Sequence, residues 1–231
     1  MLADNLKTVQ KNVEEACRRS GRSAEEVTLV AVSKTKPNEM IEELYAAGQR
    51  DFGENYIQEL RAKHEALPKD IRWHMIGHLQ RNKVKYIAEY IAMIHSVDSY
   101  ELALTIEKEA AKHDRVIPVL IEVNVAGEDT KYGVRPEDAE ELIEKISHLP
   151  HIRVTGLMTS APYVADPEED RIYFRNLRNL SVDIEDKKLD NVTVGALSMG
   201  MSNDYEIAVE EGSTMIRVGT SIFGERDYSK K

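Results

Sequence analysis

Lys34 is the residue whose type and position most clearly suggest chemistry. It closely follows a mostly apolar run over residues 27–32 and belongs to a polar segment that ends at Pro37. A lysine at the end of a buried strand keeps its stem in apolar surroundings, which lowers the pKa of its amine, as Schiff-base formation with a carbonyl requires. Two alternatives remain open. The Lys34 amine could reach solvent, and Lys36 is a rival candidate, although it precedes Pro37 and lies farther from the strand.

Two glycine-containing segments near the C-terminus could bind an anion. Residues 198–202 read Ser-Met-Gly-Met-Ser, and residues 217–221 read Arg-Val-Gly-Thr-Ser. Glycine lets the backbone approach an anion closely, while hydroxyl groups and N–H groups at a helix start donate hydrogen bonds to it. Both segments could instead be ordinary turns. Each follows a predicted strand, in the place where barrels often hold phosphate, so we favour a phosphate site.

Arg217 lies within a predicted strand over residues 215–218, where an unpaired charge would be costly to bury. Its guanidinium either reaches a nearby carboxylate or points as a hydrogen-bond donor at a ring nitrogen or a phosphate. His74 and His78 are four residues apart, but a strand-to-loop context does not bring them together as a helix would. No metal site is therefore predicted.

Short apolar runs alternate with helical patterns along the whole chain. They predict eight strands, over residues 27–32, 51–52, 72–76, 91–95, 117–125, 152–158, 192–197 and 215–218. A helical pattern separates each successive pair, over residues 37–48, after residue 55, and over 82–89, 99–112, 136–149, 167–188 and 204–211. The position after each strand carries a polar group or a glycine, as expected where the chemistry of a barrel resides.

These elements predict an α/β fold, a single (β/α)₈ TIM-type barrel domain over residues 1–231 with an additional N-terminal helix. That helix, Leu2–Arg19, repeats apolar residues at spacings of three and four. An open doubly wound sheet is the structural alternative. It would place a glycine-rich dinucleotide turn after the first strand, where this chain instead has Ser33, Lys34 and Thr35.

Composition narrows the possible partners. Lysine and arginine number 31 against 41 acidic residues, a formal net charge of −10, which argues against binding to nucleic acid or an anionic membrane. No apolar stretch is long enough to span a membrane, and polar residues interrupt the N-terminal segment where a signal peptide would be apolar. The single Cys17 rules out an internal disulfide framework and suits a reducing compartment. We therefore expect a cytoplasmic protein.

Six segments resemble one known family. They are VAVSKTKP (30–37), FGENY (52–56), WHMIGHLQRNK (73–83), GLMTS (156–160), LSMGMSNDYEIAVEEGSTMIRVGTSIFG (197–224) and RDYSKK (226–231). In this order they resemble the pyridoxal phosphate homeostasis protein family, formerly called proline synthetase co-transcribed homologue. That family is similar to fold-type III pyridoxal phosphate (PLP) proteins, whose barrel is the N-terminal domain of alanine racemase.

The resemblance implies a set of PLP contacts. Lys34 would bind the cofactor as a Schiff base, and Arg217 would face the pyridine nitrogen. The residues implied to hold the phosphate are Ser198, Gly219 and Thr220, with backbone groups of Met199 and Gly200. The residues implied to line the ring are Asn55, Ile76, Gly77 and Met158. The polar segment 127–133 either covers the barrel mouth or only connects two elements, and Lys230 and Lys231 are interpreted as a solvated tail.

We expect a PLP-binding homeostasis protein without robust catalytic activity. A carboxylate partner would keep the pyridine nitrogen protonated, but a guanidinium cannot accept that proton, so carbanion stabilisation is weaker. Racemases of this fold are similar but add a C-terminal β-domain, and their partner subunit supplies a tyrosine as second acid/base. We expect no such domain here and find no evident second partner for Lys34. The partners expected are PLP and apo-PLP enzymes as recipients, with the protein itself a monomer. The alternatives are a PLP-dependent amino-acid racemase-like enzyme and a Schiff-base aldolase acting on a sugar phosphate.

Overall fold

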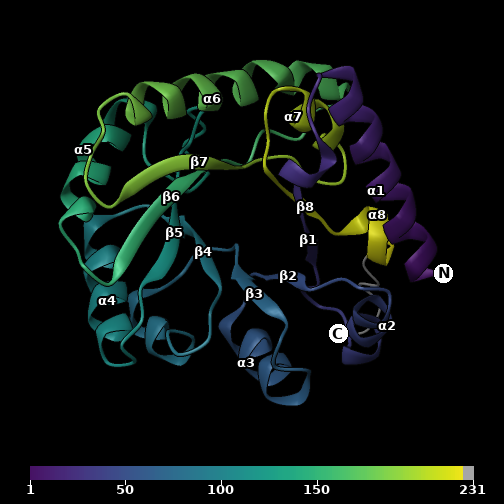
Figure 1. Ribbon diagram of the computed structural model, residues 1–231, viewed down its shortest axis with the longest axis horizontal. Helices are drawn as coiled ribbons and strands as arrows, with labels where there is room; N and C mark the ends of the chain where they lie inside the picture. Colours follow the sequence, from purple (N-terminus) through teal and green to yellow (C-terminus); the bar gives the residue numbers. More distant parts are fainter. Residues whose placement is uncertain (226–231) are drawn as a thin grey trace.

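The computed structural model describes residues 1–225, in which eight parallel strands close into a barrel in the order of the sequence (Figure 1). β1 pairs with both β2 and β8, and this closes the ring. The strands are β1 (Thr28–Val32), β2 (Asp51–Glu54), β3 (Arg72–Met75), β4 (Met93–Val97), β5 (Ile117–Glu122), β6 (Ile152–Met158), β7 (Val192–Ser198) and β8 (Met215–Val218). The predicted barrel is therefore confirmed.

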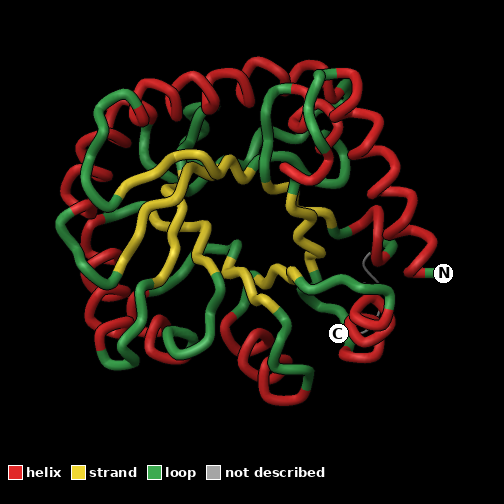
Figure 2. Tube along the Cα trace, viewed as in Figure 1, coloured by secondary structure: helices red, strands yellow, loops and turns green. Residues whose placement is uncertain are grey.

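Helices surround the strands as an outer ring (Figure 2). The α-helices are α1 (Leu2–Arg19), α2 (Asn38–Ala46), α3 (Ile57–Ala66), α4 (Tyr100–Ala111), α5 (Pro136–Ser147), α6 (Arg171–Glu185), α7 (Tyr205–Glu210) and α8 (Thr220–Phe223). Three 3₁₀ helices add to them, η1 (Ala24–Glu26), η2 (Arg81–Tyr86) and η3 (Pro167–Asp170). Within residues 1–225, no helix is both long and apolar enough to cross a lipid bilayer.

The additional N-terminal helix has a clear structural role. α8 has only four residues, too few to cover the space outside β8 and β1. α1 packs against α7 and α8 and covers that region instead (Figure 1). Its buried face includes Leu6, Val9 and Val13, at the helical spacing expected for one apolar stripe.

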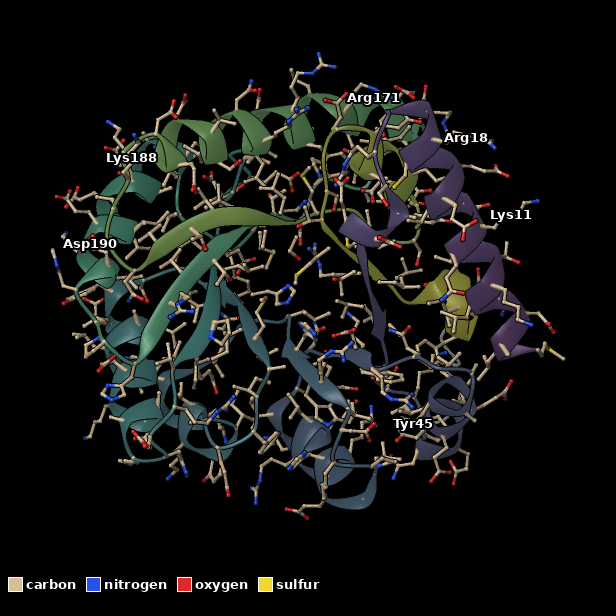
Figure 3. The ribbon with its side chains drawn as sticks, in the orientation of Figure 1. Lys11, Arg18, Tyr45, Arg171, Lys188 and Asp190 are labelled. Atoms are coloured by element: carbon tan, nitrogen blue, oxygen red, sulfur yellow. The ribbon has the colours of Figure 1, made fainter. Side chains whose placement is uncertain are left out.

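Side chains fill the space that the strands enclose, while charged residues such as Lys11 and Arg18 point outward from the helices (Figure 3). Gly156 allows β6 and β7 to approach closely. A Cβ atom at this position would lie 1.8 Å from the Ala196 carbonyl oxygen, so any side chain would force the two strands apart.

Some predicted boundaries were wrong. The helix predicted over residues 82–89 is the 3₁₀ helix Arg81–Tyr86, and the one predicted over 167–188 is divided between η3 and α6. The strand predicted over 117–125 ends at Glu122, because Val123 forms a bridge with Val134 and the chain turns. Lys230, Lys231 and the matched segment 226–231 lie outside the described residues.

Candidate cofactor site

A cavity of about 330 Å³ opens at the C-terminal ends of the strands, within the size range of small-ligand sites. Six of the eleven predicted site residues line it: Lys34, Asn55, Ile76, Arg217, Gly219 and Thr220. Lys34 is half-buried at the end of β1, and Arg217 is buried in the neighbouring strand β8. The structure thus brings the predicted amine, the predicted arginine and one predicted anion loop together.

The backbone on either side of Lys34 is held in place. Ser33 is fully buried, and its hydroxyl donates to Glu54 Oε1 at 2.6 Å. Thr35 has a φ of 63°, an unfavourable left-handed conformation for a β-branched residue. Its N–H donates to Glu59 Oε2 at 2.7 Å, which stabilises this turn. Lys34 therefore sits on a constrained turn rather than on a flexible loop.

A buried lysine organises this anchor. Lys63 on α3 donates to Glu54 Oε1 at 2.7 Å, to the Ser33 carbonyl at 2.7 Å and to Glu59 Oε2 at 3.2 Å. An ammonium group has three donors, and these three contacts use all of them. Burial raises the pKa of Glu54, while the nearby charge of Lys63 opposes that effect. Nothing in the sequence singled out Lys63, because a lysine on an amphipathic helix usually faces solvent.

The structure separates the two candidate lysines. Lys36 Nζ donates to the carbonyls of Phe223, Gly224 and Glu225 at 3.2–3.3 Å, where the chain leaves α8. Lys36 therefore ties the β1 loop to the end of α8, and it does not line the cavity as Lys34 does.

Asn55 supplies a polar atom that the described residues leave unsatisfied. Its Oδ1 is buried without a hydrogen-bond partner, and the residue borders the cavity. A buried acceptor of this kind calls for a donor from a ligand or from water. Gly77 permits the arrangement, since a Cβ there would lie 2.8 Å from Asn55 Cα. Gly77 thus supports the cavity wall without lining it.

Arg217 presents hydrogen-bond donors at the cavity wall. Nη1 donates to Ser198 Oγ at 2.6 Å, and Nη2 donates to the Thr159 carbonyl at 2.8 Å. Burial lowers the pKa of Arg217 to about 10, while the nearby charges of Asp204 and Glu122 oppose the shift. The guanidinium is still cationic at neutral pH, so a neutral ring nitrogen or an anion fits this position.

Ser198 does not take the position that the resemblance implied. Its fully buried hydroxyl lies between Arg217 and His95 inside the barrel, and it is not part of the cavity lining. Ser202 lines the cavity instead, and its Oγ accepts from the N–H groups of Gly219 at 3.2 Å and Ser221 at 3.3 Å. Both serines belong to the segment 198–202, and the sequence pattern alone did not indicate that Ser202 would line the cavity.

Three further predicted residues also lie behind the cavity rather than on its lining. Met158 and Met199 are buried in the core. Gly200 has a φ of 94°, and its carbonyl accepts from the Arg217 N–H at 2.9 Å. A Cβ at Gly200 would lie 2.6 Å from that of Ala208. Met199 and Gly200 belong to the loop that carries Ser202, whereas Met158 is the last residue of β6.

Two carboxyl groups near the cavity were not predicted. Asp204 lines it, and Asp170 lies fully buried behind it. Burial, followed by the charge of Asp204, raises the pKa of Asp170 to about 6. Burial also raises the pKa of Asp204. The strand-based search missed both residues, since neither lies at a strand end and their proximity depends on the fold.

The segment 127–133 reaches the mouth of the barrel. Lys131 Nζ donates to the carbonyl of Ser160, a residue of the cavity lining, at 3.1 Å. Tyr132 stacks on His78, with ring centroids 4.1 Å apart. Within residues 1–225, no group of three or more His, Cys, Asp or Glu residues is arranged to hold a metal ion.

The closed parallel barrel with a cavity at the C-terminal ends of its strands defines the class of protein. The chain belongs to the family described as alanine racemase, N-terminal domain, whose model matches residues 5–227. An alanine racemase of Clostridium difficile has the same fold, with a TM-score of 0.72 at 16% identity over 96% of this chain and 57% of the racemase.

Relatives with higher sequence identity identify a more specific family within this class. The pyridoxal phosphate homeostasis protein of Aquifex aeolicus (strain VF5) is 48% identical over 226 residues, 97% of this chain and 98% of that protein. The structure of PipY from Synechococcus elongatus PCC7942 with PLP bound has a TM-score of 0.83 at 35% identity, covering 97% of this chain and 100% of PipY. The chain belongs to the pyridoxal phosphate homeostasis protein family, as its motifs indicated.

Proposed function

We propose that this protein binds PLP covalently through Lys34 and acts in the intracellular homeostasis of that cofactor. The observation that carries the proposal is the convergence of Lys34, Arg217 and the Ser202 loop on one cavity. The names of the relatives and the PLP-bound structure of PipY support it.

Each cavity residue has a role suited to part of the cofactor. PLP supplies an aldehyde that condenses with a primary amine, forming a carbon–nitrogen double bond and releasing water. Lys34 provides that amine from its constrained turn. Arg217 donates to the pyridine nitrogen, and Asn55 and Ile76 border the ring. Phosphate is bound by Ser202, Gly219 and Thr220, with Met199 and Gly200 shaping the loop.

In this proposal, the protein holds PLP rather than catalysing a reaction with it. Arg217 has only donors and keeps its charge at neutral pH, so the pyridine nitrogen accepts a hydrogen bond and is not protonated. An unprotonated ring withdraws electrons weakly and stabilises a carbanion poorly. The same contact still contributes to affinity, which suits storage and release.

We further propose a single-domain monomer that works in the cytoplasm and delivers PLP to apo-enzymes. The net charge of −10 disfavours nucleic acid as a partner. Cys17, the only cysteine of the sequence, is a free thiol buried on α1.

Loop 127–133 lies beside the cavity through the contact between Lys131 and Ser160. A recipient that docks at the barrel mouth would meet this loop first.

Borohydride reduction followed by peptide mapping tests the attachment site. The wild-type protein, incubated with PLP and reduced, should carry one irreversible PLP adduct on the peptide that contains Lys34. Lys34→Ala should lose the adduct and keep its fold by circular dichroism, while Lys36→Met should retain it. An adduct that persists in Lys34→Ala would overturn the assignment. A protein that stays colourless with PLP would favour the aldolase alternative.

Solvent-deuterium exchange tests the racemase-like alternative. Removing and returning the Cα proton on opposite faces of a substrate requires two groups within hydrogen-bond reach. Tyr163 and Asp204 line the cavity and are the groups that would complement Lys34. Incubation of the PLP-loaded protein with single L-amino acids in D₂O should give no sustained exchange at Cα. Repeated turnover would contradict the binding role.

A further inference from the structure

A line of hydrogen bonds crosses the interior of the barrel. Arg217 Nη1 lies 2.6 Å from Ser198 Oγ, which lies 2.9 Å from His95 Nδ1. His95 Nε2 lies 2.9 Å from His74 Nδ1, and His74 Nε2 lies 3.0 Å from Asp51 Oδ1. All five side chains are buried. We call this set of five residues the polar chain.

The polar chain joins the two ends of the barrel. Asp51 is the first residue of β2, at the end opposite the cavity, where it pairs with Arg72. Ser198 is the last residue of β7, and Arg217 borders the cavity. His74 and His95 lie within β3 and β4, between the two ends.

The chemistry of its two ends fixes the direction of every bond. Arg217 can only donate. Burial disfavours the ionised form of Asp51, but hydrogen bonds from His74 and Arg72 outweigh this and lower its pKa to about 2, so its carboxylate can only accept. Ser198 Oγ accepts from Arg217 and donates its one hydrogen to His95 Nδ1. His95 then donates from Nε2 to His74 Nδ1, and His74 donates from Nε2 to Asp51.

If the hydrogen bonds ran in the opposite direction, one buried donor would have no acceptor. If His95 carried its proton on Nδ1, Ser198 Oγ would accept from both His95 and Arg217. The buried hydroxyl hydrogen would then have no acceptor among the described residues, at a cost of about 1–3 kcal/mol. His74 would also need protons on both ring nitrogens. Burial, with the charge of Arg217, lowers the pKa of His95, which keeps that ring neutral.

We propose that Ser198, His95 and His74 are positioning residues that hold the Arg217 guanidinium in one orientation toward the cavity through a hydrogen-bond chain of fixed direction. In this proposal the only hydroxyl hydrogen of Ser198 is committed to His95, so Ser198 does not donate to the phosphate. The effect on PLP rests on the proposed function, whereas the direction of the chain does not.

Histidine tautomers in the ligand-free protein test the direction. Two-bond ¹H–¹⁵N correlation spectra at pH 7 should show both His74 and His95 as neutral rings protonated at Nε2. A His95 ring protonated at Nδ1, or a doubly protonated His74, would overturn the proposal. This measurement contains no PLP, so it stands or falls independently of the cofactor assignment.

Two amide replacements of His95 test the link to Arg217. His95→Asn places its amide oxygen near the position of Nδ1, so Ser198 keeps its acceptor and Arg217 stays oriented. His95→Gln reaches toward the position of Nε2 and leaves Ser198 without one. We expect PLP affinity within about threefold of wild type for His95→Asn, but about tenfold weaker for His95→Gln and Ser198→Ala, with a shifted absorption band of bound PLP.

Ser96→Ala is the matched control. Ser96 follows His95 on β4 and is fully buried, but its hydroxyl makes no hydrogen bond within residues 1–225. Its affinity and absorption band should match wild type. If His95→Asn and His95→Gln lose affinity equally, or if Ser198→Ala behaves like Ser96→Ala, the positioning role is wrong. If wild type binds no PLP while the tautomers are as expected, the proposed function fails and the direction of the chain stands.

Discussion

Two groups of ionisable side chains support residues of the cavity lining, Lys34 and Ser202, and they are built in opposite ways. On the Lys34 side, the ammonium of Lys63 lies among Glu54, Glu59 and the Ser33 carbonyl, and all three of its donors are used. On the Asp204 side, Asp204 lies against a second carboxyl group, that of Asp170, whose pKa is raised by burial and by the charge of Asp204. On the Lys34 side an ammonium group lies between two carboxylates, whereas on the Asp204 side two carboxyl groups face each other.

The two sides differ in function: one fixes the position of a turn, and the other carries a charge that changes with pH. A balanced, hydrogen-bonded ion pair fixes the turn that carries the reactive amine, and covalent attachment depends on that position. The pKa of Asp170 is raised to about 6 by burial and by Asp204, and burial also raises the pKa of Asp204. The charge beside the Ser202 loop therefore depends on pH, while the charge behind Lys34 is fixed by Lys63.

The largest expected effect comes from unbalancing the Lys34 side. Lys63→Met removes the ammonium and leaves Glu54 buried without its cation, which should lower the free energy of unfolding by about 3–5 kcal/mol. Chemical denaturation at pH 7 measures this loss. Borohydride trapping of PLP should also slow, because the Ser33–Thr35 turn loses its anchor.

Two further variants sharpen this prediction. Lys187→Met removes an exposed lysine that pairs with Glu140, and it should change stability by less than about 0.5 kcal/mol. Adding Glu54→Gln to Lys63→Met should recover part of the loss, because no buried charge is then left alone. A loss below 1 kcal/mol for Lys63→Met would mean that the ion pair does not support the turn.

A smaller effect of opposite sign is expected on the Asp204 side. The pKa of Asp170 is raised from 3.8 to about 6, so the folded state binds its proton more tightly than the unfolded state. The associated stability is present below pH 3.8 and is lost as the pH rises through about 6. Asp170→Asn cannot ionise, and its amide can donate to Asp204.

Asp170→Asn should therefore gain stability over wild type as the pH rises from 5 to 8, by about 1–3 kcal/mol. Denaturation curves at the two pH values measure the gain. Asp183→Asn, an exposed position on α6, is the control and should track wild type at both. A stability difference between Asp170→Asn and wild type that does not change with pH would contradict the carboxyl-pair interpretation.

The sequence predicted the barrel and the Lys34 side better than it predicted individual contacts. Eight apolar runs alternating with helical patterns define the strand order without long-range information. The segment 82–89 was harder, because a 3₁₀ turn such as Arg81–Tyr86 has too few residues to differ from a short α-helix in its pattern. Lys34 and Arg217, which line the cavity, could be singled out from the sequence because each is anomalous within its own strand context.

Residues whose role depends on tertiary contacts were missed. Ser198 and Ser202 are equivalent in a sequence pattern, and only barrel closure turns Ser198 toward His95 and leaves Ser202 beside the cavity. Lys63 has the surroundings of a solvent-exposed helical residue until Glu54 from β2 is placed against it. Asp170 and Asp204 are far apart in the sequence, and no local pattern connects them.

The smallest effect on stability is expected for a substitution of Lys36, and it distinguishes this lysine from Lys34. Lys36 Nζ donates to three successive carbonyls at the C-terminal end of α8 from a partly exposed position. Lys36→Met should cost about 0.5–1.5 kcal/mol of stability through these lost hydrogen bonds. It should leave PLP trapping on Lys34 complete, because Glu54, Glu59 and Lys63 still hold the turn. Thermal unfolding and peptide mapping measure the two quantities. Loss of trapping in Lys36→Met, with the fold intact, would mean that the anchor extends to α8.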